Sequence, residues 1–287
     1  MRRALALLLT VLLAAPAFAW PWERVQTVRL DRPDGLSFLL VPKACVRDVA
    51  CPLVVVSHPR GQSAERLHAS PYVSQYTLAL TNANMAVLLS NDGGPNPWGS
   101  PAALAELGAL HADSVTHFRF NGRTYAFGLS MGGLMALRSA QRGPYAVSGV
   151  ILLDGRVDLL GAWGAPGGRR AEIEAAYGLS GPPTPDLDPL ITAEVQAEAQ
   201  ERLPLFIIGS HDDRTVPFTE NGLRLYLRAA QPATSRLVTL TGAHLGGAHF
   251  TADLAREVTA FVQTLERRHA APPALPPAAR QKGPTTP

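Results

Sequence analysis

The segment from Gly128 to Gly132 (GLSMG) constrains the fold more than any other part of the sequence. Residues 124–129 (TYAFGL) predict a short buried strand, and residues 131–141 (MGGLMALRSAQ) predict a helix with a face of small residues. A serine on a sharp strand-to-helix turn projects its side chain outward, and flanking glycines leave room for that turn. The first turn of the helix also offers free backbone N–H groups to a developing negative charge. We therefore interpret Ser130 as a nucleophile.

Strand-like runs alternate with helix-like segments along the rest of the chain. The runs are nearly all apolar, which is typical of strands buried on both faces of a parallel sheet. They cover residues 52–57, 84–90, 124–129, 147–153, 205–209 and 236–240, after a hairpin formed by residues 25–30 and 36–41. Helical patterns cover residues 72–82, 102–118, 131–141 and 251–268. This order predicts the α/β class, with a mostly parallel central sheet and helices on both faces.

Composition and the two ends of the sequence delimit one globular domain. Hydrophobic residues make up 46% and charged residues 17% of the chain, which suits a substantial core. Residues 1–19 have a basic start, an apolar run and a small-x-small cleavage signal, as in a secretory signal peptide. Residues 270–287 are rich in Pro and Ala and predict a disordered tail. The domain then spans 20–269, and its Gly- and Pro-rich stretch at about 155–203 predicts a small lid-like insertion.

The signal peptide has consequences for location, partners and cysteine chemistry. Without Arg2 and Arg3 the formal net charge falls from +3 to +1, so we expect no nucleic-acid partner. No second apolar segment is long enough to span a bilayer, so we expect a periplasmic or secreted protein without stable membrane insertion. Cys45 and Cys51 are expected to form a disulfide across a short loop, in preference to two free thiols or a metal pair.

Residues that acyl transfer needs follow three of the predicted strands. Ser130 ends one strand, residues 210–217 (SHDDRTVP) follow another, and residues 241–244 (TGAH) follow the last. These groups are expected to meet, because active groups gather at the carboxyl ends of parallel strands. A serine hydroxyl needs an imidazole to take its proton, and the imidazole needs a carboxylate to fix its tautomer. The order Ser, Asp, His along the chain is that of the α/β-hydrolase fold.

The choice of carboxylate rests on a resemblance. Residues 207–217 (IIGSHDDRTVP) resemble the corresponding stretch of the bacterial cutinase and polyester hydrolase family. There the acid lies four residues after the glycine and four before the proline, which implies Asp213. Counting as in shorter α/β-hydrolase loops gives Asp212 as the alternative. Asp154, which follows another strand, is a third candidate, although an aspartate in that position commonly opens a loop.

Two histidines compete for the role of base. His244 stands directly beyond a predicted strand, and we favour it because its distance to the closing helix suits the fold. His249 lies in residues 247–250 (GAHF), which resemble the Ala-Ser-His-Phe end of the cutinase-like enzymes. His249 therefore stays an alternative.

A second resemblance concerns the oxyanion hole. Residues 57–61 (SHPRG) resemble the Ser-His-Gly-x-Gly loop of proteins like dienelactone hydrolase and platelet-activating-factor acetylhydrolase. The resemblance implies that one backbone N–H comes from this loop, and Met131, the residue after the nucleophile, supplies the other. Pro59 replaces the usual glycine and has no N–H, so Arg60 becomes the expected donor.

Together these residues predict an exported serine esterase that cleaves a carboxylic ester through an acyl-enzyme, with no metal or organic cofactor. A peptidase or acyltransferase with the same triad is one alternative, and a non-catalytic binding protein of the same fold is another. The expected substrate is a small-molecule, lipid or polymer ester. Residues that either line its pocket or only pack the loops are Trp98, Trp163, Phe218 and the loop 91–95.

Overall fold

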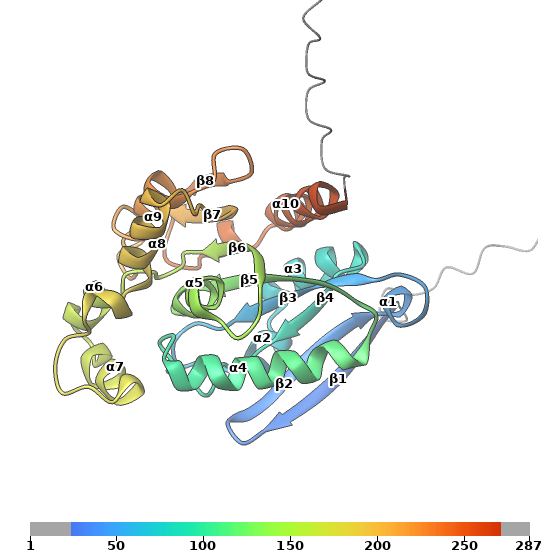
Figure 1. Cartoon of the computed structure of the whole chain (residues 1–287), viewed down its shortest axis with the longest axis horizontal. Helices are drawn as coiled ribbons and strands as arrows, with labels where there is room; N and C mark the ends of the chain where they lie inside the picture. The colour runs from blue at the N-terminus through green and yellow to red at the C-terminus, as the bar shows by residue number, and fades with distance from the viewer. Residues whose placement is uncertain (1–23, 271–287) are drawn as a thin grey trace, which may run out of the picture.

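The computed structural model describes residues 24–270, which form a sheet covered by helices on both faces (Figure 1). The predicted signal peptide lies outside the described residues, as does the predicted tail beyond Ala270. The eight strands of the sheet are arranged in the order β1-β2-β4-β3-β5-β6-β7-β8. Their bounds are β1 Val25–Arg32, β2 Gly35–Pro42, β3 Cys51–Ser57, β4 Ala86–Leu89, β5 Phe120–Leu129, β6 Val147–Leu153, β7 Leu205–Ser210 and β8 Arg236–Leu240.

Strand β2 is antiparallel to both of its neighbours, β1 and β4. All neighbouring pairs from β4 through β3 and β5 to β8 are parallel. The predicted hairpin and the mostly parallel sheet are therefore confirmed. Because β3 and β5 to β8 run side by side in one direction, their carboxyl ends lie along one edge of the sheet.

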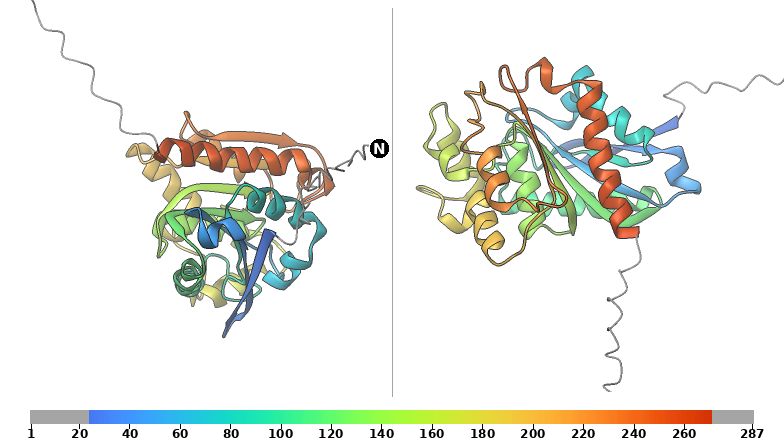
Figure 2. Two further views of the ribbon diagram at one scale, coloured as in Figure 1. Left: turned by 90° about the vertical axis from the view of Figure 1, so that its right-hand side faces the viewer. Right: turned by 90° about the horizontal axis from the view of Figure 1, so that it is seen from above.

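Helices on the two faces of the sheet build separate cores. Helices α2 (Ala64–Ala69), α3 (Pro71–Asn82) and α10 (Ala252–Ala270) cover one face, and α10 lies beside α3 (Figure 2). Helices α4 (Pro101–Ser114), α5 (Gly132–Arg142), α8 (Pro189–Glu198) and α9 (Gly222–Ala229) cover the other face. A short helix, α1 (Lys43–Arg47), precedes β3.

Alternate residues of each central strand enter opposite cores. In β3, Val54 and Val56 pack on the α3 and α10 side, whereas Leu53 and Val55 pack on the α4 side. Every residue of β3 is buried. A strand with helices on both faces needs apolar side chains at every position, which explains the unbroken apolar runs of the sequence.

The stretch predicted as an insertion divides between two places. Its helices α6 (Leu159–Gly164) and α7 (Arg169–Tyr177) form a small cluster with Trp98 and Met131, beside the start of α5. Its last helix, α8, instead enters the core beneath the sheet through Leu190 and Ala193. Only the part around α6 and α7 lies next to the carboxyl edge of the strands (Figure 1).

The predicted disulfide between Cys45 and Cys51 is confirmed, and it ties α1 to the first residue of β3. Both cysteines are fully buried in the core beside α4. Among residues 24–270, no helix has the length and apolar character needed to cross a bilayer.

Candidate active site

Ser130 occupies the turn between β5 and α5 and has a left-handed backbone conformation, with φ +51°. A Cβ atom on Gly128 would lie 2.4 Å from the Gly132 carbonyl oxygen, and one on Gly132 would lie 2.3 Å from the Ser57 carbonyl oxygen. Both positions therefore require glycine. A strained non-glycine residue at such a turn is held by its surroundings. Here the Ser130 amide donates to Leu153 at 3.1 Å, and its carbonyl accepts from the Arg156 amide at 2.8 Å.

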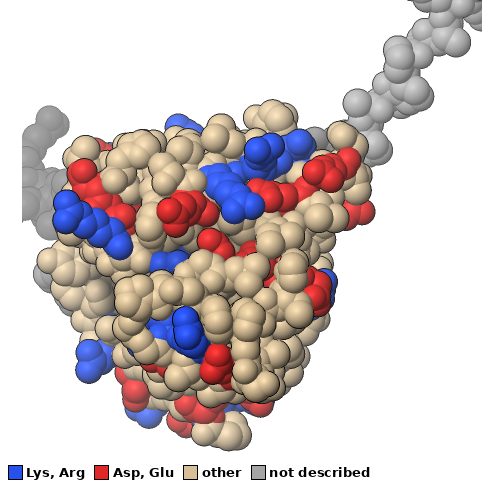
Figure 3. Space-filling view, turned by 90° about the vertical axis from the view of Figure 1, so that its left-hand side faces the viewer, with Lys and Arg blue, Asp and Glu red and all other residues tan. Residues whose placement is uncertain are grey.

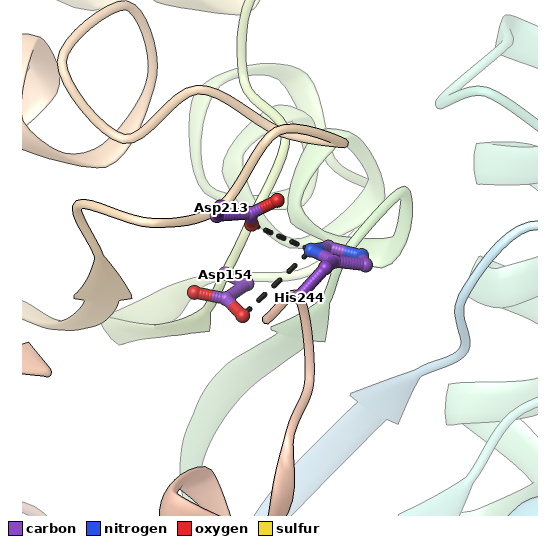
Figure 4. Close-up of side chains that lie close together, drawn as sticks. All are labelled: Asp154, Asp213 and His244. Carbon is purple, nitrogen blue, oxygen red and sulfur yellow. Dashed lines mark hydrogen bonds and ion pairs between the residues drawn. The ribbon is translucent and has the colours of Figure 1, made fainter. Parts of the chain in front are cut away.

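His244 lies between Ser130 and Asp213. Its Nε2 is 2.8 Å from Ser130 Oγ. On its other side, Nδ1 is 2.6 Å from Asp213 Oδ2, the contact drawn in Figure 4. The three side chains come from the ends of β5, β7 and β8, which the sheet brings to one edge. Ser130 is 7% exposed, and the His244 side chain is 17% exposed, so both are open to a small ligand at one side.

The hydrogen-bond partners fix the tautomer of His244. Nδ1 faces a carboxylate, which only accepts, so Nδ1 carries the proton and donates to Asp213. Nε2 is then the acceptor and faces the Ser130 hydroxyl. This tautomer can take a proton from the serine.

Asp213 is held in place by its own loop. Its Oδ1 accepts hydrogen bonds from the Thr215 and Val216 amides at 2.8 and 2.9 Å. Burial alone would raise the pKa of the Asp213 carboxyl, but the hydrogen bonds from His244 and these amides outweigh burial and lower it. Asp212 is exposed, and its carboxylate instead accepts from the Gly242 amide at 2.8 Å. The structure therefore brings Asp213 to the imidazole and leaves Asp212 beside the β8 loop.

Asp154 and His249 pair with each other, and among the described residues neither side chain bonds to Ser130 Oγ. Asp154 is 4% exposed, has φ +44°, and accepts from the Ser210 and Leu245 amides at 3.2 and 2.7 Å. Its Oδ2 is 3.0 Å from His249 Nε2. The same oxygen is 3.7 Å from His244 Nδ1, as Figure 4 shows. Burial acts to lower the pKa of His249, but the Asp154 carboxylate outweighs burial and raises it. Asp154 thus links the ends of β6 and β7 to the loop after β8, which carries both histidines.

The two expected oxyanion donors are free to bind a ligand. Within residues 24–270, neither the Arg60 amide nor the Met131 amide donates to another group. Both residues line a cavity of about 240 Å³ that also contains Ser130 and His244. The loop that carries Arg60 is anchored by Asp92, which is buried and accepts from the Ser57 hydroxyl at 3.0 Å and the His58 amide at 2.9 Å.

Other side chains of the cavity were only partly predicted. Trp98 lines it, whereas Trp163 donates to Glu174 and Phe218 packs under Gly209 in the core. Two further lining residues, Arg156 and Arg169, were not predicted. Arg156 follows β6 by three residues, so the rule that active groups lie at strand ends could have identified it. Arg169 is the first residue of α7, and nothing in its local sequence indicates that it lines the cavity.

The two carboxylates and the imidazole around His244 together have the composition of a cation site. Ligand atoms of Asp154, Asp213 and His244 lie within 4.8 Å of one another. In this structure, however, the His244 Nδ1 proton points to Asp213 and Nε2 faces Ser130. A cation bound at Nδ1 would have to displace the hydrogen bond to Asp213. The arrangement therefore fits proton transfer at Ser130 better than metal coordination.

Comparison with known proteins identifies structural neighbours. No family model matches the chain, and no curated protein sequence matches it. A truncated carbohydrate esterase from gut microbiota is 16% identical, with a TM-score of 0.62 over 82% of this chain and 92% of the other. A fluorophosphonate-binding serine hydrolase of Staphylococcus aureus is 13% identical, with a TM-score of 0.64 over 83% and 98%. An esterase of Pyrococcus furiosus is 16% identical, with a TM-score of 0.57 over 87% and 95%.

These likenesses concern the fold, because the identities are low. The resemblances to the cutinase and dienelactone hydrolase families stay predictions. The shared fold extends over 82–87% of this chain, at TM-scores of 0.57–0.64. The chain therefore has the α/β-hydrolase fold.

Proposed function

We propose that this protein is a serine hydrolase that cleaves carboxylic esters through an acyl-enzyme. The observation that carries the proposal is the position of His244, within hydrogen-bond distance of both Ser130 Oγ and Asp213 Oδ2. The fold neighbours named as esterases and as a fluorophosphonate-binding hydrolase add support.

Acylation begins when Ser130 Oγ attacks the ester carbonyl carbon and His244 Nε2 takes the hydroxyl proton. The bond between the carbonyl carbon and the alcohol oxygen then breaks, and His244 returns the proton to the leaving alcohol. A water molecule next attacks the acyl group with His244 as base, which releases the acid and restores Ser130. Asp213 holds the imidazole in its working tautomer and stabilises the imidazolium form.

The Arg60 and Met131 amides bind the oxygen that becomes negative during each attack. Both are without protein acceptors among the described residues and line the cavity beside Ser130. A donor of this kind contributes about 3 kcal/mol of transition-state stabilisation. Pro59 leaves the loop with Arg60 as its donor, because a proline has no N–H.

We further propose that the protein is exported to the periplasm or the extracellular space. The disulfide between Cys45 and Cys51 supports this, because such bonds persist in oxidising compartments. The signal-like pattern of residues 1–19 points the same way.

Hydrolysis of p-nitrophenyl esters of rising acyl length tests the activity, with mass spectrometry to detect an acyl group on Ser130. We expect turnover by the wild-type protein and a loss of at least about 10³-fold in Ser130→Ala. Ser180→Ala, at an exposed serine in the loop after α7, is the matched control and is expected to keep full activity. Folded protein that cleaves none of these esters would contradict the proposal. Cleavage of anilides alone would replace it with a peptidase.

A further inference from the structure

Three arginines line the cavity beside Ser130, among them Arg156 and Arg169. Arg156 lies in the loop after β6 and is only 5% exposed, and Arg169 is the half-buried first residue of α7. Both line the 240 Å³ cavity together with Ser130 and His244. Figure 3 shows the face of the molecule that carries α6 and α7, where basic and acidic side chains are mixed. The arginines at this cavity are therefore a local feature and not part of a broad basic surface.

Most donors of these two guanidinium groups are unused. One nitrogen of Arg156 donates to the Thr215 carbonyl at 2.5 Å, and one nitrogen of Arg169 donates to the Pro166 carbonyl at 3.0 Å. In the part of the chain that the structure describes, no carboxylate lies within ion-pair distance of either group. Arg60, at the same cavity, differs because Glu172 binds it through two nitrogens.

The charge of Arg156 is consequently poorly compensated. Burial, together with the neighbouring positive charge of Arg169, lowers the pKa of Arg156 to about 10. The carboxylates of Asp158, Asp213 and Glu220 act in the opposite direction and raise the pKa. A nearly buried cation without a partner is costly, and an anion bound at this place would remove that cost.

The two arginines also lie where two cavities meet. A second cavity of about 390 Å³ shares Arg156, Arg169 and Thr215 with the cavity at Ser130. It continues past Arg214 and Glu220 on the surface. The two arginines therefore form the wall between the reacting serine and the outer cavity, where the part of a substrate away from its ester bond would lie.

We propose that Arg156 and Arg169 form an anion subsite, so that the substrates of this enzyme are esters carrying a second, anionic oxygen group. Guanidinium groups bind carboxylate and phosphate through paired N–H donors, and both anions fit this chemistry. The inference rests on the proposed ester hydrolysis and names its substrate class.

Three acetate esters of similar size test the subsite. They are 4-acetoxybenzoate, 4-acetoxyphenyl phosphate and the neutral 4-acetoxybenzamide, with each kcat/KM divided by the rate of spontaneous hydrolysis of that ester. We expect the wild-type protein to prefer at least one anionic ester over the amide by about tenfold or more. Whichever of the two anionic esters has the larger ratio shows whether the subsite favours carboxylate or phosphate. High salt is expected to reduce this preference.

Substitution of either arginine should bring the ratio of normalised kcat/KM, anionic ester over amide, close to one. The change should arise mainly from KM. The variants are Arg156→Gln and Arg169→Gln, and the control is Arg170→Gln, the next residue of α7, whose guanidinium lies over the Trp163 ring. If Arg156→Gln does not fold, Arg169→Gln and the salt series still decide the result.

Equal rates for all three esters in the wild-type protein would overturn the subsite and leave the proposed hydrolysis standing. An unchanged preference in folded Arg169→Gln and Arg156→Gln would also overturn it. No hydrolysis of the three esters by protein that cleaves p-nitrophenyl esters would overturn the subsite alone. No hydrolysis of either set would contradict both proposals.

Discussion

At the scale of single residues, two adjacent aspartates have different partners. Asp213 donates nothing and accepts from His244 and two backbone amides, whereas Asp212 accepts from the Gly242 amide on the exposed side of the loop. Adjacent side chains in this loop point apart, so only one carboxylate can reach the imidazole. The sequence alone could place the acid within this pair, but the choice between them depends on the loop conformation.

Asp213→Asn is expected to lower kcat for p-nitrophenyl acetate by about 10³- to 10⁴-fold, because an amide in place of the carboxylate favours the wrong tautomer of His244. Asp212→Asn is the matched control. It weakens only the bond to Gly242, so we expect a change of less than about tenfold. A larger loss in Asp212→Asn than in Asp213→Asn would reverse the assignment.

The two histidines illustrate the same limit of sequence reasoning. His244 and His249 are five residues apart in one loop, and their local sequences suit either role. In the structure, His249 is fully buried and lies 3.0 Å from Asp154, and the Tyr76 hydroxyl donates to its carbonyl. These long-range contacts come from α3 and from the residue that follows β6, so no local pattern could reveal them.

At the scale of elements, helix α7 holds the loop that carries Arg60. Glu172 accepts from Arg60 Nε at 2.8 Å and from the Trp98 indole at 3.1 Å. On the other side, Asp92 anchors the start of the same loop through Ser57 and His58. The loop that carries Arg60 is therefore held between helix α7 and the loop after β4.

Glu172→Gln is expected to loosen this loop and to lower kcat/KM for a neutral ester several-fold, because misplacing an oxyanion donor weakens transition-state binding. Kinetics with p-nitrophenyl acetate checks this. Glu174→Gln, on the same helix, is the control, because Glu174 contacts Trp163 away from the cavity. If both variants behave alike, the contacts of Glu172 have no part in catalysis.

Elements were predictable where the apolar pattern was unambiguous. Strands β6 and β8 have the predicted bounds, because each is a single apolar run between turn residues. Helix α9 was not predicted. In its sequence GLRLYLRA, leucines alternate with arginine or tyrosine, which suits a strand as well as a helix. The helix is favoured because it packs Leu225 and Ala229 into the core.

At the scale of the whole molecule, the last helix is fastened to the central strand of the sheet. Glu266 of α10 accepts two hydrogen bonds from Arg123, at 2.7 and 2.6 Å. It also accepts from the Tyr125 hydroxyl at 2.7 Å and the Asn121 amide at 2.8 Å. Burial would raise the pKa of Glu266, but the hydrogen bonds from Arg123 and Tyr125 outweigh burial and lower it.

Glu266→Gln is expected to lower the free energy of unfolding at pH 7 by about 1–3 kcal/mol, because it leaves the Arg123 charge without its partner. A carboxyl whose pKa is lowered by folding stabilises the fold above its unfolded pKa of about 4.3. That contribution disappears as the pH falls through the lower folded pKa. The difference between wild type and variant should therefore shrink at pH 3.

Urea unfolding at pH 7 and pH 3 measures this difference. Glu257→Gln is the control, because its partner Arg236 is exposed, and a surface pair contributes at most about 1 kcal/mol. A difference for Glu266→Gln that is equal at both pH values, or larger at pH 3, would contradict the prediction.

The central claim is that three loops, far apart in sequence, form one proton relay at the carboxyl edge of the sheet. Labelling of Ser130 by a fluorophosphonate tests it most directly, in wild type, His244→Ala and His249→Ala, each with its folding verified by circular dichroism. We predict labelling of Ser130 in wild type and His249→Ala, and labelling about 10³-fold slower in His244→Ala. Folded wild-type protein that is not labelled at Ser130, or labelling that is lost in His249→Ala and kept in His244→Ala, would contradict the account.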